Sequence, residues 1–181
     1  MRVPRNYRVI AIPLIVASTL TACKIHQQKN GAESKVDVQT PVGNLSAKAN
    51  ENIDSSDVGL PLYPGAQRIP EQNASSGAEA NISAPFMHLR ITAAKFQSED
   101  PPDKILGFYR KKLAAYGKIE EGHGRNSHTQ IQGFKWESTG DQTSLAASQG
   151  ESHYIVMVQP HGSGSCFALM QIYAGGPSQP I

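Results

Sequence analysis

Four side chains of the kind that bind zinc lie close together between Glu120 and His128. They are Glu120, Glu121, His123 and His128, and carboxylates and imidazoles can coordinate the metal if such a loop folds back on itself. Their spacing matches no zinc motif, and the glycines and serine between them are typical of a solvated turn. We therefore expect no bound metal. A metal-dependent enzyme using the 120–128 loop is retained as an alternative hypothesis.

A second group of reactive side chains follows His161, where Ser163, Ser165 and Cys166 alternate with glycines. The run lacks the spacing of a nucleophile elbow, and no neighbouring acid is placed to orient the histidine. Its glycines favour a tight hairpin loop between two strands. We expect no catalytic residue and no cofactor, and we keep two alternatives open: a small hydrolase using His161, and a small-ligand carrier.

Cys23 is the residue with the clearest chemistry. Three arginines and no acid occupy residues 1–8, and an apolar run follows from Val9 to Ala22, which is the order of a secretory signal. The run is too short for a comfortable membrane span of about 20 residues. It ends in Leu-Thr-Ala-Cys, which resembles the lipobox of bacterial lipoproteins. The resemblance implies cleavage between Ala22 and Cys23 and lipidation of the Cys23 thiol.

The residue after the lipobox cysteine bears on the destination of the chain. Lys24 stands there, and not aspartate, which in Gram-negative lipoproteins resembles export to the outer membrane. Two or three acyl chains hold a protein firmly on a membrane. We therefore expect a protein of the bacterial cell envelope, on the inner leaflet of the outer membrane and facing the periplasm.

Charge and cysteine content narrow the possible partners. The chain has 17 Lys and Arg against 15 Asp and Glu; removing residues 1–22 takes away three arginines and no acid, leaving 14 against 15. This near-neutral balance provides no basic stripe for phosphates, so nucleic acid is excluded as a partner. Once Cys23 is acylated, Cys166 has no disulfide partner, and its apolar setting indicates a buried side chain.

The mature chain divides by composition into a leader region and one domain. We assign residues 1–22 to the signal peptide, 23–34 to a polar tether, 35–58 to a weak hairpin and linker, 59–175 to a single domain and 176–181 to a C-terminal tail. The domain is long enough to bury a core of ordinary size. We therefore expect one folded unit behind the anchor.

One strong helix and several strands are predicted within residues 59–175. Asp100 can cap a helix that begins near Pro101, in which Ile105, Tyr109 and Leu113 recur at helical spacing, and Gly117 fits its end. Strands are indicated at residues 86–96, 129–138, 152–160 and 165–173. In the first of these Phe96 falls out of phase with the apolar positions, so we expect a bulge near residues 93–94.

The stretch Gly59–Pro70 precedes these elements. Tyr63, Pro64, Gly65 and Ala66 satisfy the sequence rules of a type II turn, with glycine at the position of positive φ. The same stretch contains Pro61-x-x-Pro64, which could bind as a polyproline helix in an aromatic groove. We interpret residues 63–66 as a structural turn and keep the binding motif as the alternative.

The order of these features is similar to that of a group of uncharacterised bacterial envelope proteins. The likeness rests on the Tyr-Pro-Gly-Ala turn and the Phe-Tyr-Arg-Lys-Lys-Leu helix and covers about residues 36–174; it implies no activity, ligand or catalytic residue. A more distant likeness, at the level of fold only, is to the accessory lipoproteins of the outer-membrane barrel-assembly machinery. We predict an α+β fold, with an antiparallel sheet of about four to six strands and one main α-helix packed on one face.

Both faces of the last two strands are apolar, and a single helix can cover only one of them. We expect the hairpin within residues 36–49, together with the stretch before residue 66, to pack on the second face or to extend the edge of the sheet, leaving a monomer. The predicted function is that of a non-enzymatic binding or scaffolding lipoprotein, attached to the membrane through its lipid and able to bind an envelope protein partner.

Overall fold

The computed structural model describes residues 24–30, 33–40, 43–49, 52–69, 76–124, 127–131, 134–138 and 140–176. Its strands are β1 (Lys24–Asn30), β2 (Glu33–Thr40), β3 (Gly43–Ala49), β4 (Gln67–Arg68), β5 (Gly77–Ala84), β6 (Met87–Ser98), β7 (Glu120–His123), β8 (Ser127–Ile131), β9 (Phe134–Ser138), β10 (Thr143–Gln149), β11 (Ser152–His161) and β12 (Gly164–Gly175). One α-helix, α1 (Pro102–Leu113), is followed by a 3₁₀ turn, η1 (Ala114–Tyr116). Ala22, Cys23 and the proposed signal peptide lie outside the described residues.

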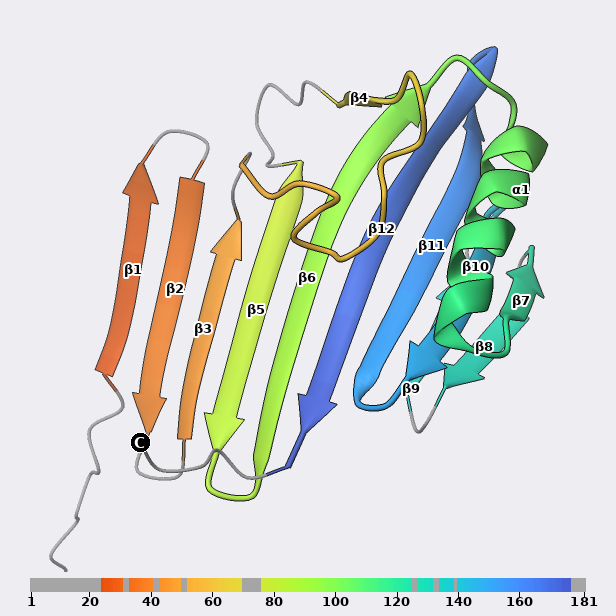
Figure 1. Cartoon of the computed structure of the whole chain (residues 1–181). Helices are drawn as coiled ribbons and strands as arrows, with labels where there is room; N and C mark the ends of the chain where they lie inside the picture. The colour runs from red at the N-terminus through yellow and green to blue at the C-terminus, as the bar shows by residue number, and fades with distance from the viewer. Residues whose placement is uncertain are drawn as a thin grey trace, which may run out of the picture.

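A large antiparallel sheet dominates the molecule (Figure 1). Nine strands follow one another in the order β1-β2-β3-β5-β6-β12-β11-β10-β7, β4 adds a tenth by pairing with β6, and β8 and β9 form a separate two-stranded sheet. The prediction of an α+β fold with about four to six strands is therefore wrong: the fold is mostly antiparallel β. The error arose because β5 and β10 are rich in alanine and serine, which give weak strand signals.

The helix α1 lies against β10 and β11 on one face of the sheet (Figure 1). Ile105, Leu106, Tyr109 and Leu113 form its buried stripe, close to the predicted spacing. The expected cap at Asp100 is wrong, because Pro101 occupies the N-cap position and no side chain caps the helix. Gly117 follows the 3₁₀ turn with φ of 130° and ψ of −159°, which only glycine adopts readily.

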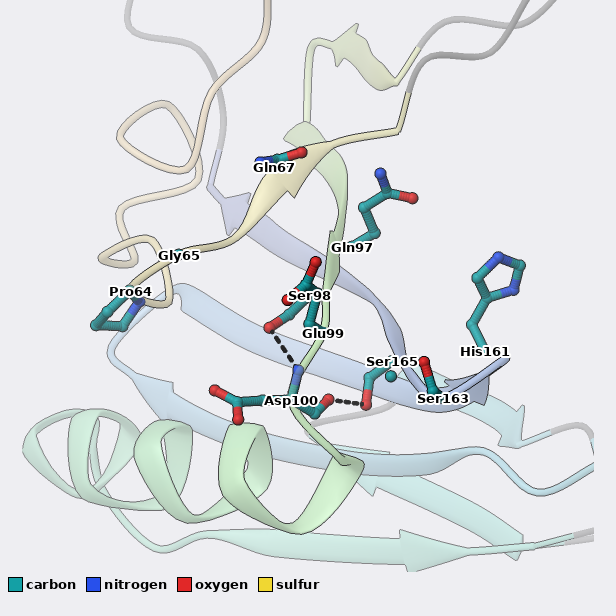
Figure 2. Close-up of a pocket in the computed structure, with 11 residues that line it drawn as sticks. Pro64, Gly65, Gln67, Gln97, Ser98, Glu99, Asp100, His161, Ser163 and Ser165 are labelled. Atoms are coloured by element: carbon teal, nitrogen blue, oxygen red, sulfur yellow. Dashed lines mark hydrogen bonds between the residues drawn. The ribbon is translucent and has the colours of Figure 1, made fainter.

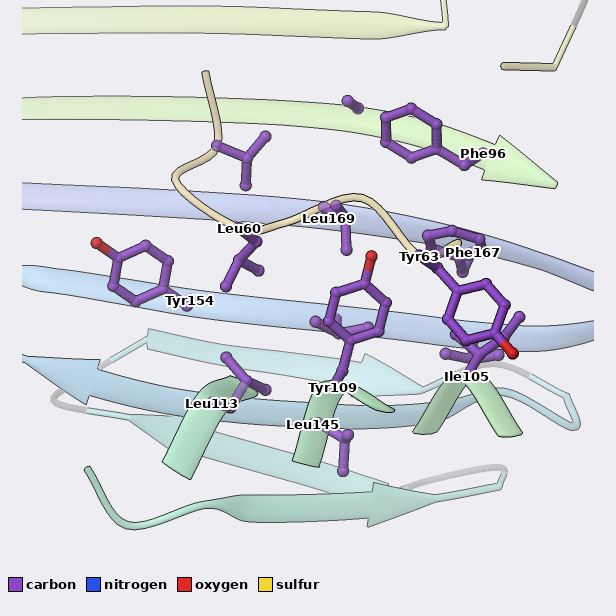
Figure 3. Packing of buried hydrophobic residues seen from close by; sticks show 14 of the residues in the cluster. Leu60, Tyr63, Phe96, Ile105, Tyr109, Leu113, Leu145, Tyr154, Phe167 and Leu169 are labelled. Atoms are coloured by element: carbon purple, nitrogen blue, oxygen red, sulfur yellow. The ribbon is translucent and has the colours of Figure 1, made fainter. Parts of the chain in front are cut away.

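The main core lies between α1 and the sheet (Figure 3). Phe96, Phe167, Tyr109 and Tyr63 meet there as an aromatic cluster, with ring centroids of Phe96 and Phe167 5.6 Å apart and those of Tyr109 and Phe167 5.9 Å apart. The segment from Val58 to Tyr63 crosses this cluster and buries Val58, Leu60 and Tyr63. The stretch that opens the predicted domain is therefore part of the core.

The strand β6 crosses from one half of the sheet to the other without the expected bulge. Its pairing with β12 is continuous, with Ala93 opposite Met170 and Ala94 opposite Leu169. Phe96 is out of phase with Leu89 because it packs toward the helix, whereas Leu89 packs on the opposite face. Apolar residues on both faces, and not an inserted residue, explain the change of phase.

The segment before residue 50 extends the sheet. β2 and β3 form the expected hairpin, and β3 pairs with β5 along six residue pairs from Asn44–Ser83 to Ala49–Ala78. Of the two placements considered, the hairpin has the extended edge. The stretch before residue 66 has neither, because it packs in the core on the α1 face and not on the second face. Lys24–Asn30, assigned to a tether on composition, forms β1 and pairs with β2, so backbone pairing and not apolar content brings these polar residues into the sheet.

Candidate functional site

A polar pocket of about 530 Å³ lies at the end of the sheet where β6 and β12 meet the start of α1. Amide, hydroxyl, carboxylate and imidazole groups line it, contributed by Gln67 of β4, Gln97 of β6, Glu99, His161 of β11 and Ser163 (Figure 2). Gln67 and Gln97 are paired directly across β4 and β6. Such groups can donate and accept hydrogen bonds, which suits a polar ligand better than an apolar one.

Asp100 is held firmly at the base of this pocket (Figure 2). Its carboxylate accepts hydrogen bonds from Lys104 Nζ at 2.6 Å and from the Tyr63 hydroxyl at 2.8 Å. These two donors, Lys104 first, hold the pKa of the Asp100 carboxyl below its usual value. Burial and the bond to Asp100 raise the pKa of Tyr63. The carboxylate is therefore ionised and engaged in structure, and it is a poor proton donor.

The reactive residues that follow His161 do not form a catalytic group. Ser165 is 1% exposed and its hydroxyl donates to the backbone carbonyl of Asp100 at 2.7 Å. Cys166, its neighbour along β12, points to the other face of the sheet. The His161 ring points away from both Ser163 and Ser165 (Figure 2). Within the described part of the chain, no acid or nucleophile is bonded to His161, so the geometry gives the hydrolase alternative no activated nucleophile.

The 120–128 loop forms β7 and the start of β8. Glu121 binds the Arg110 guanidinium of α1, with 3.1 Å between Oε2 and Nε, and this bond holds the pKa of Glu121 below its usual value. The Nε2 atom of His123 lies 3.0 Å from the same carboxylate, and its Nδ1 lies 3.2 Å from the Thr143 hydroxyl. The His128 side chain is outside the described residues. Among described side chains, no group of three or more metal-ligating residues gathers.

The residues 63–66 have the geometry of a turn. The Ala66 N–H donates to the Tyr63 carbonyl at 3.0 Å, and Gly65 has φ of 77°. Tyr63 is 9% exposed and contacts Phe108 and Phe167 edge-on. Because the Tyr63 ring is buried inside the molecule, it is not presented to a partner.

The face of the sheet opposite α1 carries apolar residues in register across many strands. We call it the apolar face, and it consists of three cross-strand rows. The first row is Val38, Leu45, Ile82 and Leu89; the second is Val36, Ala47, Ala80, Ile91 and Ile172; the third is Ala49, Ala78, Ala93, Met170, Ile155 and Ala146. Residues directly opposite one another in a sheet share a face, so each row is continuous.

The apolar face is buried at one side of the sheet and more exposed at the other. Ala146, Ile155 and Ile172 are buried, with 0%, 2% and 6% exposed. The members on β2, β3 and β5 are half-buried or exposed, and Leu45 reaches 40%. On the same three strands the side facing α1 is polar: Lys35 and Asp37 form an ion pair on β2, and Glu79 of β5 forms one with Arg90 of the neighbouring strand β6. The open part of the apolar face is therefore a surface that the described residues do not cover.

The sequence predicts only a part of the apolar face. It identified two apolar faces on β11 and β12, but missed the rows on β5, where Ala78, Ala80 and Ile82 alternate with Glu79 and Asn81. That alternation was the available signal.

No helix among the described residues is long and apolar enough to span a membrane. No protein-family model, curated protein or solved structure matches the chain.

Proposed function

We propose that the mature chain is a lipid-anchored protein of the bacterial envelope that binds another envelope protein through its apolar face and catalyses no reaction. Cys23 is the proposed anchor, after cleavage behind Ala22, on the periplasmic side of the outer membrane. The lipobox resemblance and the signal pattern of residues 1–22 support this location. The single observation that carries the binding role is the apolar face.

The size of the apolar face fits a protein interface. Four neighbouring strands, β2, β3, β5 and β6, at about 4.8 Å spacing and three rows at about 7 Å give about 400 Å² of flat area. Monomers rarely leave a larger apolar patch in water, and one side of a standard protein interface is about 800 Å². The face also has few charges, since its rows contain only aliphatic residues and methionine. These properties favour a folded protein partner.

Photocrosslinking in the source cell tests this role with a matched pair of positions. Ala47 and Ser46 are consecutive in β3, both half-buried, and point to opposite faces. A photoreactive residue at Ala47 should crosslink to an envelope protein, whereas one at Ser46 should not. Equal crosslinking from both positions, or none from Ala47, would refute the role of the face, and a crosslink to a second copy would contradict the expected monomer.

The polar pocket supports a second candidate role, the binding of a small polar ligand. Its volume is within the usual range of small-molecule sites, and Gln67, Gln97 and Ser163 offer both donors and acceptors. Native mass spectrometry after gentle extraction tests this role. A bound small molecule that is lost on Gln97→Ala would support it, and an unliganded mass from freshly extracted protein would count against it.

A further inference from the structure

One end of the sheet contains the start of β1 and therefore lies next to the proposed anchor. We call it the anchor rim, formed by Lys24, Thr40, Gly43, the Ala84–Met87 turn and Gly175. Strand pairing places these ends side by side: Lys24 is opposite Gln39, Asn44 opposite Ser83, and Ser83 opposite His88, which in turn pairs with Gly175. The same ends lie together at the lower side of Figure 1.

Large exposed hydrophobic side chains gather at the anchor rim. Among the described residues, four such side chains are exposed: Phe86 at 72%, Leu45 at 40%, Leu62 at 37% and Tyr173 at 36%. Phe86 is at the tip of the β5–β6 turn, and Leu45 and Tyr173 are each two residues from a rim end of their strand. Only Leu62 lies elsewhere, beside Tyr63, whose hydroxyl contacts Asp100 at the other end of the sheet.

The opposite end of the sheet is polar. It contains the pocket with His161, Ser163 and Glu99. The first row of the apolar face, from Val38 to Leu89, lies two residues inward from the anchor rim. The molecule is therefore asymmetric along its strands: three of these four large exposed hydrophobic side chains lie at the anchor rim, and the polar pocket lies at the other end.

The position of the anchor explains this asymmetry. Cys23 directly precedes Lys24, the first residue of β1, so no more than about 4 Å of chain separates them. Acyl chains on Cys23 would hold the rim at the bilayer surface, and aromatic side chains are favoured at the level of the lipid headgroups. Glu151 is also near this end, and its carboxylate accepts a hydrogen bond from the Tyr173 hydroxyl at 2.8 Å.

We propose that the anchor rim is a membrane-contact surface, in which Phe86 and Leu45 insert into the interfacial region of the bilayer and orient the polar pocket away from it. This inference rests on the proposed lipid anchor. It adds an orientation: the strands stand across the membrane plane with the β5–β6 turn toward the lipid. The second and third rows of the apolar face are then turned sideways and stay available to a neighbouring protein.

Spin labelling of the acylated mature protein on vesicles of phosphatidylethanolamine and phosphatidylglycerol tests the proposal. Single cysteines replace Phe86, Leu45 or Leu62 in a Cys166→Ala background, where the acylated Cys23 cannot take the label. Leu62 is the matched control, since its exposure is close to that of Leu45 but it lies off the rim. Circular dichroism of each labelled variant checks the fold.

The expected result is that labels at residues 86 and 45 collide severalfold more with oxygen than with a water-soluble nickel chelate, relative to the label at residue 62. Equal ratios at all three positions in acylated protein would overturn the membrane-contact surface while leaving the anchor in place. Mass spectrometry of the same sample measures acylation. A chain without acyl groups would overturn the anchor itself, and this inference with it.

Discussion

Substitution of Gly164 tests the packing that forms the polar pocket. Gly164 is the first residue of β12 and is buried. A Cβ atom built there would lie 2.2 Å from the Ser98 carbonyl oxygen and 2.9 Å from Glu99 Cα. Ordinary contact requires at least 3.4 Å, so Gly164→Ala must move two backbone segments apart by more than 1 Å.

The cost can be estimated from two effects. Overpacking a rigid site costs about 1–3 kcal/mol, and separation of the strands also lengthens the bond from Ser165 to the Asp100 carbonyl, which contributes about 0.5–1.5 kcal/mol. We expect a loss of about 2–4 kcal/mol in the free energy of unfolding, which is a fall of about 1–2 M in the urea midpoint.

Gly107→Ala is the control for this experiment. A Cβ at Gly107 has no atom within 4 Å, and alanine in a helix is about 0.5–1 kcal/mol better than glycine. Urea unfolding of the mature chain without lipid should therefore show opposite shifts for the two variants. A free energy of unfolding for Gly164→Ala within about 0.5 kcal/mol of that of the unsubstituted chain would refute the close approach of β12 to Ser98 and Glu99.

Three further predictions concern the turn, the pH dependence and the anchor. Gly65→Val should destabilise by about 1–3 kcal/mol, because φ of 77° is strained for valine although no atom lies within 4 Å; an unchanged melting temperature would return residues 59–70 to the binding-motif interpretation. Burial lowers the pKa of His153, which is 2% exposed and lies 2.8 Å from the Ser148 hydroxyl, so the native state resists protonation and loses stability as pH falls below about 6.5. His153→Gln should reduce this loss of stability between about pH 7.5 and 5. If the urea midpoints of the variant and the unsubstituted chain change with pH in the same way, His153 is not the source of the loss. Cys23→Ala should abolish labelling of the chain by a fatty acid in cells. Undiminished labelling of this variant would contradict the proposal that Cys23 carries the lipid.

The parts of the fold that could be predicted are those with strong local patterns. Helix α1 has Ile105, Tyr109 and Leu113 at helical spacing, and β11 and β12 are long apolar runs joined by a Gly-containing loop. Such patterns encode burial directly. The alternation of side chains along β11 and β12 also predicts that both faces of these strands are apolar, and this indicates a second apolar surface on the sheet.

The parts that could not be predicted depend on distant pairing. β10 contains only one large apolar residue, Leu145, yet Leu145, Ala146 and Ala147 are fully buried between neighbouring strands. Small residues occur there because the packed neighbouring elements leave little space for side chains, and no local sequence pattern reveals that space. The sequence predicts one strand over residues 129–138, but the structure has two strands there, β8 and β9, which pair antiparallel with each other. The pocket likewise joins residues 67, 97 and 161, which are far apart in the chain.

The most direct test of the central claim is the mass of the complex that the acylated chain forms in its own membrane. Ala47→Glu places a charge in the second row of the apolar face, and Ser46→Glu places the same charge on the polar side of β3. After gentle extraction, the unsubstituted chain and Ser46→Glu should both remain in a complex with another envelope protein, while Ala47→Glu should run as a monomer of unchanged stability. The same complex in all three, or a monomer in all three, would contradict the binding role of the apolar face.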